Sequence, residues 1–521
     1  MTGIEETIYL VEVEAYDALL PGVRTLRYSS GAGYVTSPSA TPANTFYPPR
    51  VMKPTEFSRT AFSDARVMGG SSVGDGEVIL ANADGGLNDL LDYGFDGRSL
   101  RILVGRETAA YPAGFTEFYS GTVEAADATA DTIVLRLRDR LALLDLPFSD
   151  VRYAGTNSLP SGKEGTEDDI KGQIKPRAYG RCYQVPLIQV NTALKIWQCH
   201  DGTVYAIDAV YDRGILLTFG SDHANLAALE AATVASNTYH TCKAEGLIRF
   251  GTTPFGPPTA DIRGDATGSY VDHVGAIVKR ILMTQCGVSF GDIDSSSFTA
   301  LDAAANYEVG IYVAGDESRQ SVIDQLLLSV GAWLVPDRTG VWQVGRLTAP
   351  VGSPAATFTA DHILSQTKRP PADPERGVPV WQVSLRYKRY WQTFRDTDVD
   401  IAGGVSEATR AQLVQEWRTV TAEDASVKTA HLLAPLLKRD TLLVSAADAQ
   451  TEADRLLALH KVRRDMVDAD VAINAGTASL DLGQEARLKT ARMGYGAGRD
   501  FRVIGISTDG RKQKMTAQLW G

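Results

Sequence analysis

The first part of the chain alternates between apolar and polar residues. Tyr9, Val11 and Val13 fall on one face of residues 7–14, and Glu12 and Glu14 fall on the other. This period of two is typical of a β-strand with one buried face. The same alternation predicts short strands at residues 98–106, 118–124 and 133–138.

Two stretches rich in turn-forming residues interrupt these strands. Residues 27–50 are rich in Ser, Gly, Pro and Thr, so we expect a loop or arm there. Residues 151–172 form a polar connector. The pattern therefore predicts a β-rich unit over residues 1–150 and a second one over residues 151–265, which includes a short helix near residues 226–234.

The spacing of apolar residues becomes helical in the middle of the chain. One helix is predicted by Val271, Val274, Val278, Ile281 and Leu282, with Ser269 placed to cap it. A second helix is expected over residues 317–330, with Asp316 as its cap. Its buried stripe comprises Val322, Ile323, Leu326, Leu327 and Val330.

A β-hairpin follows the second helix directly. Residues 332–335 and 341–346 flank the turn-forming sequence PDRTG. We expect Trp333 and Trp342 on these strands to pack beside Leu326. The helices and the hairpin predict an α+β unit over residues 266–365.

The last unit, residues 366–521, opens with a proline-rich linker at residues 366–379. Residues 381–388 alternate like a half-buried strand and carry an aromatic patch of Trp381, Tyr387, Tyr390 and Trp391. Helices are predicted at residues 407–418 and 446–464, and short strands at residues 471–520. The predicted fold class is multidomain α+β, predominantly β.

Composition narrows the class of function. The 521 residues carry a formal net charge of −11, and 44% of them are hydrophobic. This net charge gives no electrostatic case for stable binding of nucleic acid or of an anionic membrane. No apolar run is long enough to span a membrane, and the acidic N-terminal segment does not resemble a signal peptide. We expect a chain that folds in a cytosol.

The candidates for catalysis are few. Cys199 with His200, and His240 with Cys242, could form thiol–imidazole pairs, but catalytic Cys and His normally converge from distant segments. Cys182, Cys199, Cys242 and Cys286 lack the clustered spacing of zinc ligands, so we expect free thiols; an iron–sulfur cluster would need all four to meet in space. No cofactor is predicted.

An acidic loop offers one possible cation site. Asp396, Asp398, Asp400 and Glu407 have the spacing of calcium ligands, but Ile401 stands where the loop needs glycine. We expect a solvated acidic loop there. Two other patterns fail on chemistry. The carboxylates of Glu164, Glu167, Asp168 and Asp169 lie in a polar connector without an apolar cleft, and the glycines of residues 155–163 and 494–499 have the wrong spacing for phosphate loops.

Several segments, spread over nearly the whole chain, resemble the tail-tip or baseplate hub family of long-tailed bacteriophages and related gene transfer agents. They are GEVILANADGGLNDLLDYGFDGR at residues 76–98, LRLRDRLALLDLP, DIKGQIKPRAYGRCYQV, the hairpin GAWLVPDRTGVWQVGRL, and LDLGQEARLKTARMGYGAGRDFRVIGI at residues 480–506.

The resemblance implies a structural virion protein and no enzyme. It implies a ring of three copies, each with two tube-like β-barrel domains, that closes the tail tube and opens for DNA ejection. The implied partners are the distal tail protein, the tape-measure protein and the tail or central fibres, with DNA passing only transiently. The implied location is the tail tip of the virion, after assembly in the host cytoplasm. Two alternatives stay open: a tail-associated cell-wall hydrolase and a receptor-binding tail fibre.

Overall fold

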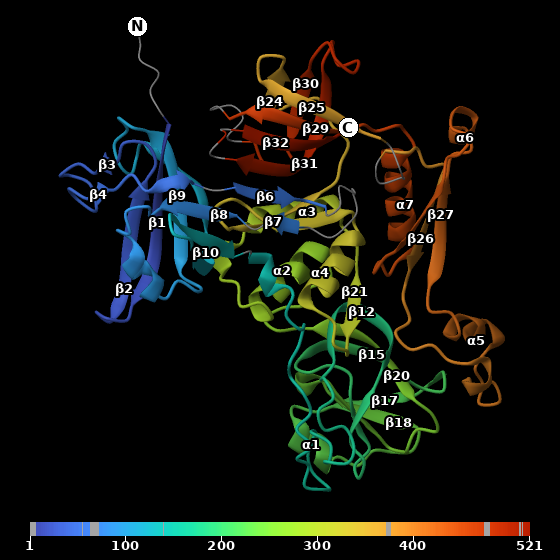
Figure 1. The fold of residues 1–521 in the computed structure, drawn as a ribbon. Coiled ribbons are helices and arrows are strands. Elements are labelled where there is room, and N and C mark those ends of the chain that lie inside the picture. Colours follow the sequence, from blue (N-terminus) through green and yellow to red (C-terminus); the bar gives the residue numbers. More distant parts are fainter. Residues whose placement is uncertain are drawn as a thin grey trace.

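The computed structural model describes residues 7–54, 56–62, 72–74, 76–138, 140–370, 377–473, 480–509, 512 and 514–521. Over these ranges the chain is a multidomain, predominantly β protein, which confirms the predicted fold class. Figure 1 shows separate β-rich bodies around a central group of helices. None of the helices in these ranges is long and apolar enough to cross a membrane.

A seven-stranded sheet forms the first body, in the order β2-β1-β9-β10-β11-β8-β5. Its strands are β1 (Thr7–Asp17), β2 (Gly22–Ser29), β5 (Val51–Lys53), β8 (Glu77–Ala81), β9 (Ser99–Arg106), β10 (Phe115–Ala128) and β11 (Thr132–Arg138). The four strands expected from the alternation are all present. In β11, Ile133, Leu135 and Leu137 are buried as predicted.

Strand β1 differs from its prediction, because both of its faces are buried. The segment expected to be a loop or arm contains the short strands β3 (Tyr34–Val35) and β4 (Phe46–Tyr47) and covers the second face. Glu12 is 5% exposed there. Its carboxylate accepts hydrogen bonds from the Tyr47 hydroxyl (2.5 Å), the Tyr111 hydroxyl (2.9 Å) and Arg101 Nε (2.5 Å).

Two five-stranded sheets form the second body, at the bottom of Figure 1. One contains β12 (Arg177–Pro186), β15 (Val204–Asp212), β16 (Ile215–Leu216), β20 (Pro258–Asp265) and β21 (Gly310–Val313). The other contains β13 (Ile188–Asn191), β14 (Ile196–Gln198), β17 (Thr218–Asp222), β18 (Thr238–Cys242) and β19 (Leu247–Phe250). The predicted short helix is present as α1 (Leu226–Ala231).

The central helices are α2 (Val274–Thr284), α3 (Ser295–Ala304) and α4 (Arg319–Leu328). Both predicted caps are wrong. The Asp302 carboxylate, from α3, accepts hydrogen bonds from the Gly275 and Ala276 amides at the start of α2, while Ser269 contacts Arg280. At α4 the Ser318 hydroxyl accepts from the Ser321 amide. Asp316, the residue expected to cap α4, instead pairs with Arg152.

The predicted hairpin is present as β22 (Ala332–Pro336) and β23 (Trp342–Arg346). Its two tryptophans enter different cores. Trp342 packs with Leu326 in the central core, as expected, but Trp333 lies in the core of the C-terminal sheet. The hairpin therefore joins two cores, since neighbouring positions along a strand face opposite sides.

An eight-stranded sheet lies at the top of Figure 1. It contains β6 (Glu56–Thr60), β7 (Ser72–Gly74), β24 (Ala356–Thr359), β25 (Ile363–Arg369), β29 (Met466–Ala472), β30 (Glu485–Lys489), β31 (Arg499–Asp509) and β32 (Lys514–Trp520). Two features differ from expectation. Residues 366–369 of the expected linker lie in β25, and residues 371–376 of it lie outside the described ranges. Strand β6 crosses from the first segment to pair with β31.

A three-stranded sheet at the right of Figure 1 consists of β26 (Gln382–Tyr387), β27 (Arg418–Glu423) and β28 (Leu436–Asp440), with α7 (Ala446–His460) packed on one face. The helix expected at residues 407–418 is shorter: α5 spans Glu407–Leu413, because Arg418 already begins β27. The small helix α6 (Val427–Ala430) lies at the end of this sheet. The division of the chain into four segments stays a prediction.

Candidate assembly surfaces

The turn between β1 and β2 presents two exposed leucines. Leu19 and Leu20 are 79% and 66% exposed. The Asp17 carboxylate fixes this turn by accepting hydrogen bonds from the amides of Leu19 (2.9 Å) and Leu20 (3.0 Å). These hydrogen bonds hold the pKa of Asp17 below its usual value, and the bond from the Leu20 amide has the largest effect. The backbone of the turn that carries the two exposed leucines is therefore held in one conformation.

A loop of the second body presents a phenylalanine in the same way. Phe255, between β19 and β20, is 83% exposed. The Asp212 carboxylate accepts hydrogen bonds from the amides of Phe255 (2.8 Å) and Gly256 (3.2 Å). An anchored backbone again carries an exposed apolar side chain.

The third exposed pair follows α6. Leu432 and Leu433 are 86% and 94% exposed. The chain before them is held by Lys428, whose ammonium lies 3.6 Å from the centroid of the Trp381 ring, and by the hydrogen bond from the His431 amide to the Val427 carbonyl. Trp381, from the predicted aromatic patch, thus supports this turn.

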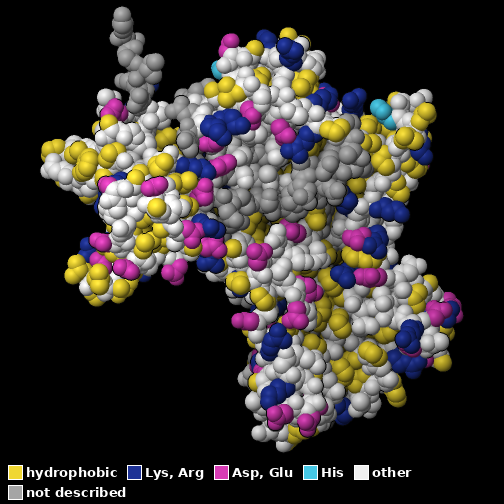
Figure 2. All heavy atoms as spheres, viewed as in Figure 1, with side chains coloured by type: hydrophobic (Ala, Val, Ile, Leu, Met, Phe, Trp, Pro, Cys, Tyr) yellow, Lys and Arg dark blue, Asp and Glu magenta, His cyan; other side chains and the backbone are white. Residues whose placement is uncertain are grey.

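These three groups are called the apolar tips below: Leu19 with Leu20, Phe255, and Leu432 with Leu433. Figure 2 shows hydrophobic side chains gathered on the projections at the left of the molecule and over α6 at the upper right. Exposed apolar side chains of this size mark interaction sites when they gather. Fixed loops lose little conformational entropy on binding, so the tips are well suited to contact other proteins.

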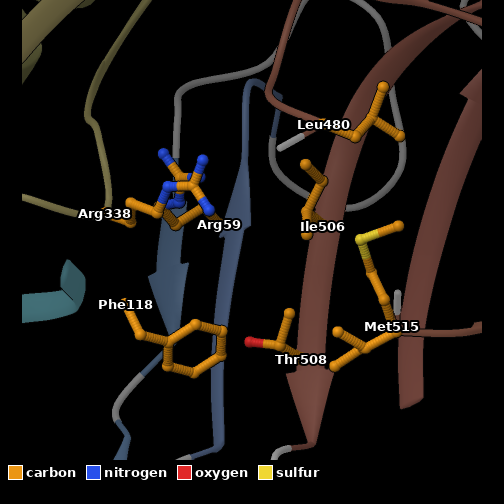
Figure 3. A pocket seen from close by; sticks show the side chains of 8 residues that line it. Arg59, Phe118, Arg338, Leu480, Ile506, Thr508 and Met515 are labelled. Atoms are coloured by element: carbon orange, nitrogen blue, oxygen red, sulfur yellow. The ribbon is translucent and has the colours of Figure 1, made fainter. Parts of the chain in front are cut away.

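A close-packed junction holds the bodies together. Figure 3 shows Arg59 from β6, Arg338 from the hairpin turn and Phe118 from β10 facing Ile506 and Met515 of the C-terminal sheet. Arg59 is 5% exposed and donates hydrogen bonds to the Pro336 carbonyl (3.3 Å) and Asp481 (2.9 Å). The cavity between these residues measures about 20 Å³, room for about one water molecule. The junction is structural and is too small for a ligand.

The two thiol–imidazole pairs considered from the sequence are not brought together as catalytic groups. Cys199 Sγ donates to the Gly246 carbonyl (3.3 Å), and His200 Nδ1 accepts from the Ala178 amide (2.9 Å). Burial raises the pKa of Cys199 to about 12 and lowers that of His200 to about 4. A thiol with a raised pKa is a poor nucleophile at neutral pH.

The second pair has different partners as well. Cys242 lies in an apolar core, and burial raises the pKa of its thiol. His240 contacts His223 and Ser221. Cys182 is also in an apolar core, and Cys286 packs at the edge of another. All four cysteines are free thiols.

The acidic loop before α5 is tied to arginines. Glu407 and Asp396 both pair with Arg410, at 2.6 and 3.7 Å. The Asp400 carboxylate accepts a hydrogen bond from the Gly403 amide at 2.8 Å. Asp396 and Asp398 lie in one short helical turn. Within the described ranges, no three His, Cys, Asp or Glu side chains are grouped so that they could hold a metal ion.

Three of the four other carboxylates considered from the sequence, those of Glu164, Glu167 and Asp169, have structural partners. Glu164 pairs with Lys175 and Glu167 with Lys171, each at 2.6 Å. Asp169 accepts from the Thr166 hydroxyl, also at 2.6 Å. An open groove of about 500 Å³ beside α2 has a mixed lining that includes Val271 and Ala276. Its polar groups bind one another: His273 bonds to Asp272 (2.6 Å) and to Asn306 (2.7 Å).

Comparisons with known proteins give structural likenesses only. No family model and no curated protein sequence matches this chain. Several solved structures similar to it are tail proteins. The tail protein from Neisseria meningitidis MC58 has a TM-score of 0.41 at 9% identity, with 98% of this chain and 96% of that one covered. A prophage tail protein from Listeria monocytogenes EGD-e has a TM-score of 0.39 at 8% identity, covering 98% and 94%.

A third structure, the 43 kDa tail protein of prophage MuSo2 from Shewanella oneidensis, has a TM-score of 0.36 at 10% identity, covering 99% and 98%. These proteins are of the kind that the sequence motifs resemble. The TM-scores of these three structures are all below 0.5.

The apolar tips were not predicted from the sequence, although a signal for them exists. Each tip places large apolar residues beside turn-forming residues: Leu19 and Leu20 precede Pro21 and Gly22, and Phe255 lies between prolines and glycines. Large apolar residues inside a turn, where no buried face is available, indicate an exposed contact.

Proposed function

We propose that this chain is a structural protein of a phage-type tail, the baseplate hub at the tail tip, and that it has no catalytic role. The apolar tips carry this proposal. They lie on separate parts of one chain and are held by Asp17, by Asp212, and by Lys428 on Trp381. A chain that fixes exposed apolar groups in several places is suited to contact several neighbours at once.

The proposed assembly is a ring of three copies that closes the tail tube and opens for DNA ejection. Its proposed partners are the distal tail protein, the tape-measure protein and the tail or central fibres. The net charge of −11 supports a lumen that DNA passes without binding stably, since a basic wall would hold the phosphates. The proposed location is the tail tip of the virion, reached after assembly in the host cytoplasm.

The test of this proposal is assembly of tip variants. Leu19→Ser with Leu20→Ser, Phe255→Ser, and Leu432→Ser with Leu433→Ser are made in the full chain. Each buried Leu or Phe contributes about 1.5–3 kcal/mol to a contact, so each lost side chain should weaken association about tenfold or more. Sedimentation velocity over a concentration series measures the oligomer, alone and with distal tail and tape-measure proteins.

Leu146→Ser provides a matched control, because Leu146 is 46% exposed but lies beside the start of α4 and not at a tip. Asp17→Ala provides a second comparison, because it frees the Leu19–Leu20 turn without removing either leucine. The proposal predicts weaker association for the tip variants and for Asp17→Ala, while hydrogen-exchange protection of the buried cores stays unchanged in the tip variants. Equal association of all variants and wild type would contradict it.

A further inference from the structure

Two histidines lie against each other at the edge of the second body. His223 directly follows β17, and His240 is in β18. His223 Nε2 lies 3.0 Å from His240 Nδ1, and the Ser221 hydroxyl lies 3.2 Å from each of these nitrogens. The pair takes no part in the proposed tail function.

The two rings meet end to end. Their centroids are 5.2 Å apart and their planes differ by 22°. The path from one ring centre to its nitrogen, across the N···N contact of 3.0 Å, and on to the other ring centre is about as long as the distance between the centroids. The two facing nitrogens therefore lie roughly on the line that joins the ring centres. The contact is therefore an N–H···N hydrogen bond, and a single proton lies between the rings.

The pair fastens an edge strand. In its sheet β17 is last in the order and pairs only with β18, in parallel, with an irregularity between Phe219 and Asp222. The His240 ring lies against the backbone of β17: a side chain at Gly220 would come within 2.4 Å of it. The His223 amide donates to the Thr241 carbonyl at 2.7 Å. The end of β17 is thus held by these contacts and the histidine pair.

The charged groups around the two histidines are bound to other partners, so none of them is available to neutralise the charge if both rings become protonated. Arg249 of β19 lies opposite His240 and donates to the carbonyls of Leu229 and Glu230. Asp222 accepts from the Thr241 hydroxyl and the Lys243 amide, and its carboxylate lies 3.5 Å from the Lys243 ammonium. Burial, then His223 and then Arg249, lower the pKa of His240.

Acid changes this contact in two steps. A first proton can enter at a ring nitrogen that faces away, and the N–H···N bond becomes charge-assisted and stronger. A second proton places an N–H on both facing nitrogens, so two donors and two positive charges oppose each other. We propose that His223 and His240 form an acid-sensitive latch, and that the second proton releases the end of β17 from β18.

Hydrogen exchange of the full chain tests the latch. Amide protection is measured at pH 7.5 and 5.0 and corrected for the intrinsic pH dependence of exchange. The latch predicts that protection of peptides over residues 218–224 falls by about tenfold or more on acidification, while peptides over β14 and β19 keep theirs. The double variant His223→Gln with His240→Gln has no titrating pair and should show no such fall. His362→Gln, in the C-terminal sheet, is the matched control and should behave like wild type.

Constant protection in wild type, or an equal fall in the double variant, would overturn the proposal. Should the double variant fail to fold, the wild type still decides. NMR of chain labelled at the histidine Cε1 carbons follows the contact during acidification. The His240 signal should shift below the ordinary histidine pKa, because burial, His223 and Arg249 lower the pKa of His240. A His240 signal that shifts at or above the ordinary value would equally overturn the latch.

Discussion

Replacing Leu326 by alanine should loosen the centre of the molecule. Leu326 lies on α4 and is fully buried in the largest core, together with Ile281, Phe298 and Trp342. The change removes three carbon atoms. The lost transfer free energy is about 2.4 kcal/mol at about 0.8 kcal/mol for each carbon, and a residual cavity adds to it. We expect a loss of about 2–5 kcal/mol in the stability of this core.

One melting temperature cannot report this loss, because a chain with several cores does not unfold in one step. Hydrogen exchange of peptides over α4, β22 and β23 resolves the central core by itself. A loss of 2–5 kcal/mol should speed exchange there by about 30-fold or more, since 1.4 kcal/mol corresponds to a factor of ten. Leu433→Ala is the matched control, because Leu433 is 94% exposed, and should leave exchange unchanged. Unchanged exchange in Leu326→Ala would refute the assignment of Leu326 to a packed core.

Three further predictions concern buried polar groups and thiols. Burial raises the pKa of Asp324 to about 6, above its unfolded value, so the stability of α4 should rise as pH falls from 7 to 4. Asp324→Asn should gain about 1–3 kcal/mol at pH 7 and lose that pH dependence, measured by hydrogen exchange of peptides over α4. Burial alone would raise the pKa of Glu12, but hydrogen bonds from Tyr47, Arg101 and Tyr111 lower it below its usual value. The ionised Glu12 carboxylate therefore stabilises the folded chain at neutral pH, and this stabilisation is lost on acidification. Glu12→Gln should cost about 1–3 kcal/mol, visible as faster exchange in β1 and β9, and unchanged exchange would contradict the network. Replacing all four cysteines by alanine should cost about 1–3 kcal/mol at each buried site without changing the oligomer. Stoichiometric iron or zinc in purified wild type would show that the thiols have another role.

Local patterns were predictable from the sequence. Strand β11 and the hairpin β22–β23 follow from alternation and turn residues, which act over a few positions. The stripe of α4 was equally clear, because its buried residues recur at helical spacing.

Features that depend on distant segments were not predictable. Glu12 is buried because the segment containing β4 folds back over β1, and α2 is capped by Asp302 from another helix. Helix α3 was missed because it buries only Phe298 and Leu301. The pairing of β6 with β31 joins residues more than 400 positions apart, a contact that no local pattern encodes.

The apolar tips were missed for the opposite reason. Periodicity finds residues that face a core within the chain, whereas Phe255 and Leu433 face outward. The His223–His240 contact was also beyond the sequence, because it depends on the irregular pairing of β17 with β18. The fold establishes both kinds of site, because it decides which apolar side chains stay exposed and which distant residues meet.

Images of the assembled protein test the tail-hub proposal most directly. The full chain is purified with and without distal tail and tape-measure proteins, imaged by electron microscopy, and weighed by native mass spectrometry. The account predicts a threefold ring with the apolar tips at contacts between subunits or with partners, and loss of the ring in the tip variants. A chain of 56.1 kDa that stays monomeric under all these conditions and never enters a tail would contradict it.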